Sequence, residues 1–96
     1  MKNMYIVCYD IKDDERLRQV YNKMCGFGEH MQYSVFVCYL TPKEKVMLNE
    51  MLLHSINQKE DRVMIVNLGS SNAIAERRVE RLGAQEPLKE PSVTIV

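Results

Sequence analysis

An aspartate at the end of an apolar run is the residue best placed for chemistry in this chain. The run Met4-Tyr5-Ile6-Val7-Cys8-Tyr9 leads directly to Asp10. Such a run predicts a strand covered on both faces, and reactive side chains commonly lie where strands leave a sheet. The Asp10 carboxylate can bind a divalent cation, since Mg²⁺ prefers carboxylates, water and phosphate oxygens. Alternatively, Asp10 only caps the turn or helix that follows it.

A second apolar run, from Gln32 to Leu40, lies one expected helix later. The stretch 29–40 contains no glycine or proline. It is therefore interpreted either as one long bent strand or as two strands broken near Ser34, and periodicity alone does not decide. The Ser34 hydroxyl can donate to a bound phosphate, and a hydroxyl at a strand kink is equally expected without a ligand.

Three short segments together resemble the CRISPR-associated Cas-two family, small proteins of the spacer-acquisition machinery. They are Tyr9-Asp10-Ile11, Asp13-Asp14 and Gln32-x-Ser34-Val35-Phe36. The closing apolar run 61–68 fits as well, so that the resemblance covers residues 4–68. It implies two strands within 29–40, a sheet-to-sheet homodimer and a nuclease that depends on Mg²⁺ or Mn²⁺. In such a nuclease, Asp10 is both the catalytic residue and the metal ligand.

The resemblance supports two functional hypotheses. The first is a metal-dependent endonuclease that hydrolyses single-stranded RNA or double-stranded DNA. The second is a homodimeric scaffold that bridges integrase subunits of the Cas-one family and supports the DNA spacer precursor. Two alternatives stay open, a toxin ribonuclease of the VapD group and a non-catalytic ferredoxin-like regulatory domain, because a fold alone does not separate functions. The match around Ser34 and Phe36 argues against the regulatory domain.

Basic and polar side chains supply candidate contacts to nucleic acid. Arg16 and Arg18 lie near the start of the first expected helix, where they can contact a phosphate backbone or pair with nearby acids. His30 stands where many members of the resembled family carry a basic residue, so a phosphate contact there is weaker and pH-dependent. The densest basic group is Arg77, Arg78 and Arg81. The candidate set is Tyr9, Arg16, Arg18, His30, Ser34, Arg77 and Arg78.

Composition limits the class of protein. The chain has 96 residues, which suits one domain, and its hydrophobic fraction of 46% argues against disorder. Thirteen basic and thirteen acidic side chains cancel, which argues against a protein that coats nucleic acid non-specifically. No apolar run approaches membrane-spanning length and no signal-peptide pattern is present, so we expect a cytoplasmic protein. The three cysteines have no metal-ligand spacing and predict buried free thiols.

The expected fold class is α+β. The order strand, helix, strand, strand, helix, strand predicts a ferredoxin-like βαββαβ sandwich over residues 1–69. Within it, we expect helices over 13–25 and from a Thr41 cap onward, and a fourth strand over 63–68. Residues 70–96 form an extension of the same domain. It has a helix over 72–82, with Ala75, Val79 and Leu82 on one side, a linker, and an edge strand over 93–96 that is swapped to the partner subunit.

A homodimer also follows from the pattern of the strands. Segments 4–9, 35–40 and 63–68 are apolar on both faces, whereas two helices cover only one face of the sheet. The simplest cover for the second face is the same sheet from a second subunit. The two Asp10 side chains then approach each other. At about 4 Å two carboxylates repel by about 4 kcal/mol at an effective dielectric constant of about 20, and a bound cation offsets this repulsion.

Overall fold

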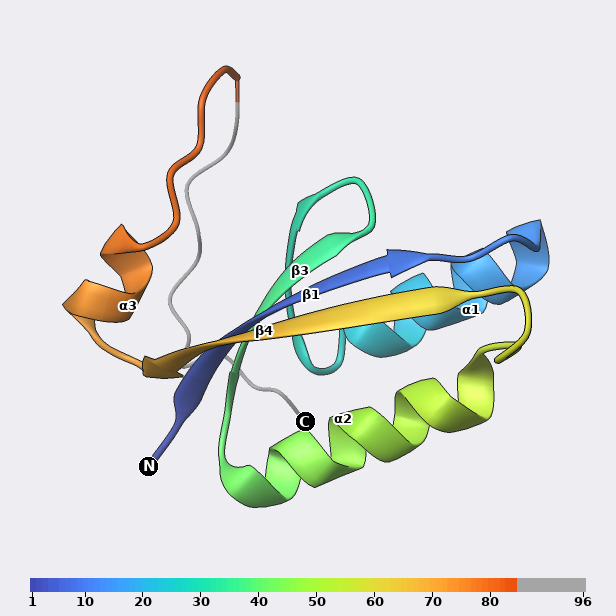
Figure 1. The fold of residues 1–96 in the computed structure, drawn as a ribbon, viewed down its shortest axis with the longest axis horizontal. Helices are drawn as coiled ribbons and strands as arrows, with labels where there is room; N and C mark the ends of the chain where they lie inside the picture. Colours follow the sequence, from blue (N-terminus) through green and yellow to red (C-terminus); the bar gives the residue numbers. More distant parts are fainter. Residues whose placement is uncertain (85–96) are drawn as a thin grey trace.

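Three helices and four strands follow one another along residues 1–84, the part of the chain that this computed structural model describes (Figure 1). The elements are β1 (Asn3–Asp10), α1 (Asp14–Met24), β2 (Gly28–Gln32), β3 (Val35–Leu40), α2 (Pro42–Ser55), β4 (Arg62–Ser70) and α3 (Ala73–Arg77). This confirms the α+β class and the expected order of elements. The linker and the swapped strand predicted over 93–96 lie outside the described residues.

One antiparallel sheet in the order β2-β3-β1-β4 forms the middle of the molecule. Helices α1 and α2 lie along one side of it, and α3 follows the far end of β4 (Figure 1). Strand β1 is central and pairs with both β3 and β4. Because β1 is antiparallel to β4, the end of β1 lies beside the start of β4, opposite the end that carries α3.

Local sequence signals fix where the two long helices begin. The Asp13 side chain accepts a hydrogen bond from the Arg16 backbone N–H at 2.9 Å and caps α1. Thr41 and Glu44 form a reciprocal capping box at α2, with Pro42 in the first turn. The Thr41 cap was expected from the sequence. Among residues 1–84, no helix is long and apolar enough to cross a membrane.

The stretch 29–40 forms two strands, as the family resemblance implies. Between β2 and β3 the chain turns at Tyr33 and Ser34. Ser34 has a φ of 56°, in the left-handed region that residues other than glycine seldom adopt. The alternative of two strands broken near Ser34 is therefore the right one.

Alternation along the strands divides the core between two sides of the sheet. On the side of α1 and α2, Tyr5, Val7 and Tyr9 pack with residues of both helices. On the other side, Met4, Val37 and Tyr39 pack against Ala75 of α3. The two long helices thus cover most of one side, while the short α3 covers only one end of the other.

The last helix is shorter than predicted. The expected helix over 72–82 ends at Arg77, and the Leu82 side chain is 97% exposed rather than packed. The Arg78 and Val79 backbone N–H groups bond to carbonyls three residues back, which tightens and ends the turn. Since only Ala75 and Val79 reach the sheet, too little apolar area is buried to sustain further turns.

The cysteines are all free, but they differ in burial. Cys38 is buried in β3, Cys8 is half-buried, and Cys25 is exposed after α1. The prediction of buried thiols is therefore right for Cys38 and wrong for Cys25. Burial raises the pKa of the Cys38 thiol to about 12, so it acts as a small apolar side chain.

Gly28 lets β2 approach β3 closely. A Cβ at this position would overlap the Val37 carbonyl and lie 2.6 Å from the Cys38 sulfur. Neither neighbour can retreat, since one is backbone and the other is fully buried. The β2–β3 pairing therefore depends on the missing side chain.

We expect Gly28→Ala to lower the free energy of unfolding by about 1–3 kcal/mol, because the added methyl overpacks the β2–β3 pair. Urea unfolding followed by circular dichroism measures this change. Gly26→Ala is the matched control, since a Cβ there lies at ordinary contact, 3.4 Å from the Lys23 carbonyl. Equal stability of the two variants would contradict the close-approach explanation.

Candidate functional site

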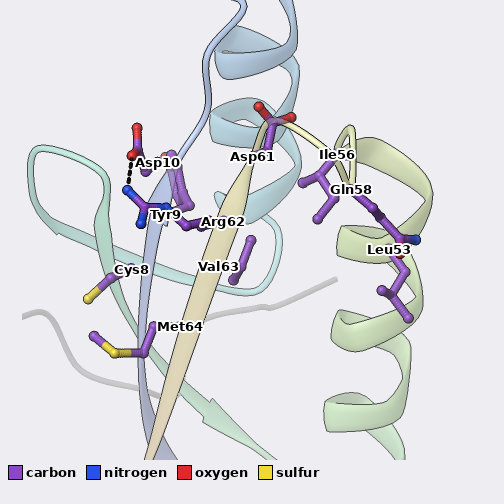
Figure 2. Close-up of a pocket in the computed structure, with 10 residues that line it drawn as sticks. All are labelled: Cys8, Tyr9, Asp10, Leu53, Ile56, Gln58, Asp61, Arg62, Val63 and Met64. Atoms are coloured by element: carbon purple, nitrogen blue, oxygen red, sulfur yellow. Dashed lines mark hydrogen bonds and ion pairs between the residues drawn. The ribbon is translucent and has the colours of Figure 1, made fainter.

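Asp10 ends β1 directly opposite Arg62, the first residue of β4. Its Oδ2 accepts hydrogen bonds from an Arg62 guanidinium nitrogen at 3.0 Å and from Lys12 Nζ at 3.2 Å. Figure 2 shows the Asp10–Arg62 contact at the mouth of a depression beside the strand ends. All three side chains are substantially exposed, so this charged group is accessible to a ligand.

The surroundings of Asp10 keep it ionised. The hydrogen bond from Arg62 and then that from Lys12 lower the pKa of its carboxyl group below the ordinary 3.8. Asp10 is therefore a carboxylate at neutral pH and suits cation binding or water orientation better than proton donation. The capping alternative does not hold for α1, because the side chain that caps this helix belongs to Asp13.

A single chain does not hold a complete metal site in its described part. Residues 1–84 contain no group of three or more His, Cys, Asp or Glu side chains placed to hold a metal ion. Asp10 brings one carboxylate, and both of its described ion pairs engage the same oxygen. A divalent cation at Asp10 thus requires further ligands, and the predicted Mg²⁺ or Mn²⁺ stays a prediction.

Asp61 is a key residue that sequence reasoning did not identify. Its side chain is fully buried and accepts hydrogen bonds from the backbone N–H groups of Lys12 and Asn57 at 2.9 and 2.8 Å. Arg16 donates to both carboxylate oxygens, at 2.9 and 3.2 Å. Asp61 thereby joins the loop after β1, the loop after α2, and α1. In the sequence, Asp61 resembles an ordinary turn residue before a strand. Only the burial of its side chain in the folded structure shows that it holds these three segments together.

Arg16 has structural partners. Besides Asp61, its guanidinium contacts Glu60 at 3.0 Å, and only 26% of the side chain is exposed. The hydrogen bond to Asp61 raises the pKa of Arg16 above its ordinary value, which keeps the pair charged. The predicted contact between Arg16 and nucleic acid stays a prediction, and the structure adds this role in holding the loops.

Four other predicted residues lie around one depression between α1 and the β2–β3 turn. They are Tyr9, Arg18, His30 and Ser34. Burial raises the pKa of the Tyr9 hydroxyl to about 12, so it stays protonated. Arg77 and Arg78 lie elsewhere, in and after α3 at the opposite end of the sheet, and Arg78 donates to the Leu68 carbonyl at 2.8 Å.

The side of the sheet that carries Asp10 is open near this residue. Figure 2 shows that the side chains of Asp10, Cys8 and Met64 project to one side of β1 and β4. Val63 projects to the other side, where Leu53 of α2 and Ile56 after it also lie. Met64 is 60% exposed and Val66 is 39% exposed on the open side. The candidate site therefore combines a charged group with an adjoining apolar surface.

Comparison with known proteins identifies the family that this chain resembles. The model of the family described as CRISPR associated protein Cas2 matches residues 2–73. The CRISPR-associated endoribonuclease Cas2 2 of Thermodesulfovibrio yellowstonii is 43% identical over 75 residues, which cover 78% of this chain and 82% of the relative. The CRISPR-associated endoribonuclease Cas2 1 of Rhodospirillum rubrum is 35% identical over 95 residues, with 98% and 92% covered.

Solved structures agree with the sequence comparison. Cas2 of Streptococcus pyogenes, crystallised at pH 6.5, has a TM-score of 0.71 and 33% identity, over 83% of this chain and 99% of that one. A hypothetical protein from Thermus thermophilus has a TM-score of 0.78 and 29% identity, over 93% and 100%. The four-stranded sheet with its helices is thus shared with Cas2 structures.

We expect Asp61→Asn to lower the free energy of unfolding at pH 7 by about 2–3 kcal/mol, because a buried, charge-assisted set of hydrogen bonds is weakened. The Arg16 hydrogen bond holds the pKa of Asp61 well below its ordinary 3.8 in the folded state. Its stabilisation is therefore complete above that value and is lost as the pH falls through the lower, folded pKa.

Urea unfolding from pH 7 down to pH 2 measures this dependence. The wild type should lose stability steeply below about pH 4, and Asp61→Asn should show less of this slope. Glu60→Gln is the control, since this exposed partner of Arg16 should contribute less than about 1 kcal/mol. Identical acid slopes for wild type and Asp61→Asn would refute the assignment.

Proposed function

The chain belongs to the CRISPR-associated Cas2 family, and on this premise we propose that it is a CRISPR adaptation protein that works as a homodimer. The dimer is a scaffold that joins integrase subunits of the Cas-one family and supports the DNA spacer precursor. It also carries an endonuclease centre at Asp10 that hydrolyses phosphodiester bonds. Family membership favours this role over a VapD-like toxin and over a regulatory domain.

The observation that carries the proposal is the open apolar side of the sheet beside Asp10. Ile6 and Cys8 of β1 are only half-buried, and Met64 and Val66 of β4 are exposed. Contiguous apolar patches of this kind mark interaction surfaces. A patch centred on paired strands can meet its own copy about a two-fold axis, which closes the assembly at two subunits.

Such a dimer brings two copies of Asp10 into one site. Asp10 projects from β1 on the same side as Cys8, so it lies at the margin of the patch. Two carboxylates, water and phosphate oxygens are a suitable set for Mg²⁺ or Mn²⁺. When bound, the metal would polarise the phosphodiester and make a water more nucleophilic. The relatives' name, CRISPR-associated endoribonuclease, supports nuclease activity in this family.

The residues around Asp10 have separable tasks in this proposal. Arg62 and Lys12 are exposed cations within hydrogen-bond distance of Asp10, so they can turn to phosphate oxygens and stabilise negative charge. Asp10 remains ionised because both cations lower its pKa. As a weak base with a fixed charge, it orients a water toward phosphorus. Asp61 holds the Lys12 backbone and thus positions the loop.

We expect Met64→Glu to raise the dissociation constant of the homodimer by about tenfold or more, because a carboxylate is then buried in an apolar interface. Sedimentation equilibrium measures the constant. Val46→Glu is the matched control, since Val46 is 57% exposed on α2, which lies on the other side of the sheet. A dimer that tolerates Met64→Glu as well as Val46→Glu would refute this interface.

We expect Asp10→Asn to reduce cleavage by about 100-fold or more, because the charge that orients water and binds metal is removed. The assay compares labelled single-stranded RNA and duplex DNA, with Mg²⁺ and with EDTA. EDTA should abolish cleavage. Glu50→Gln is the matched control, since it neutralises an exposed carboxylate on α2 and should leave cleavage unchanged. Cleavage that survives Asp10→Asn would refute a nuclease centre at this residue.

A further inference from the structure

The depression between α1 and the β2–β3 turn is a second candidate site, separate from Asp10. Its volume is about 410 Å³, within the range of small-molecule sites, and aromatic rings form much of its lining. We propose that it binds one unpaired nucleobase of a single-stranded nucleic acid, with Arg18 at the adjoining phosphate. This inference rests on the proposed function and adds the class of ligand and the residues that recognise it.

The walls of the depression are preformed. The Tyr21 ring meets the His30 ring edge-on, with centroids 5.2 Å apart and planes at 78°. Both rings contact Phe36, at 5.6 and 5.2 Å, and Phe36 is fully buried. Because a buried ring holds the two outer rings, the aromatic surface does not need to reorganise when a base binds.

Tyr33 supplies an aromatic ring with free area for stacking. It is 82% exposed at the turn between β2 and β3, although a large aromatic side chain usually gains stability by burial. The turn itself is held in place. Ser34 has a φ of 56°, and its carbonyl accepts a hydrogen bond from the Tyr9 backbone N–H at 3.1 Å. Strained backbone that is held in place clusters at functional sites, among them sites that bind ligands.

The charges at the depression favour a nucleotide over a bare phosphate. Arg18 is exposed and makes no ion pair with an acid in residues 1–84, so its guanidinium is available. Asp14 lines the same depression and offsets this positive charge. Since one cation and one carboxylate bind an anion weakly, stacking on Tyr33 and Tyr21 must supply most of the affinity. Stacking of unpaired bases on aromatic rings is how proteins commonly hold single strands.

The depression and Asp10 face opposite sides of the sheet. Tyr9 and Asp10 are consecutive in β1, so their side chains project to opposite faces. Tyr9 lines the aromatic depression on the side of α1, whereas Asp10 lies on the open side. A single strand that rounds the end of β1 can therefore place a base in the depression and its backbone near Asp10.

The test measures binding without cleavage. Fluorescence anisotropy in EDTA compares a short fluorescein-labelled single-stranded RNA with the same strand carrying abasic sites. The wild type should bind the intact strand about fivefold or more tightly, which corresponds to the stacking of one base. Tyr33→Ala should remove this preference, Tyr33→Phe should retain it, and neither should affect the abasic strand. Lys43→Gln, an exposed cation on α2, is the control for non-specific charge.

The outcomes separate this site from the nuclease centre. Because Tyr33 is exposed, its truncation should leave thermal unfolding unchanged, and a loss of binding then reports the site itself. Asp10→Asn should keep the preference for the intact strand over the abasic strand, even where its cleavage is lost. Equal binding of intact and abasic strands, or unchanged binding by Tyr33→Ala, would overturn the base site while leaving the Asp10 centre untouched.

Discussion

The buried carboxylate of Asp61 makes the contacts on which the arrangement of the sheet end that carries Asp10 depends. It binds the backbone N–H of Lys12 after β1, the backbone N–H of Asn57 after α2, and the guanidinium of Arg16 in α1. Three segments far apart in the sequence are thereby held at one point. Asp61 is also followed directly by Arg62, the partner of Asp10. Asp61 therefore holds the loop that follows Asp10, and it directly precedes the arginine that faces Asp10.

The central position of β1 gives the fold two different working surfaces at the same end. Alternation sends Asp10 to the open side of the sheet and Tyr9 to the side of α1. On the first side, apolar residues of β1 and β4 surround a charged group, which suits a second copy of the chain. On the second side, rings from α1 and the β2–β3 turn surround a depression of nucleotide size. Two consecutive residues of β1 thus belong to different surfaces: Asp10 to the open side and Tyr9 to the depression.

The sequence predicted the features that short-range rules control. The cap at Thr41 follows from side chains that bond to nearby backbone. The predicted length of the last helix was wrong. The apolar spacing that includes Leu82 is typical of a helix, but the sequence does not show whether another part of the fold lies there for Leu82 to pack against. The contacts of Asp61 could not be predicted either, because its partners are distant in the sequence and only the packed fold brings them together.

The pairing of one carboxylate with two cations at the end of β1 also bears on how a neutral chain meets a polyanion. The formal net charge is zero, so the chain as a whole does not attract nucleic acid through its net charge. Around Asp10, however, Arg62 and Lys12 leave an excess of one positive charge. At physiological ionic strength such a local excess acts over about 8 Å, the screening length. For the proposed nucleic-acid ligand, attraction would therefore begin only once the two are nearly in contact.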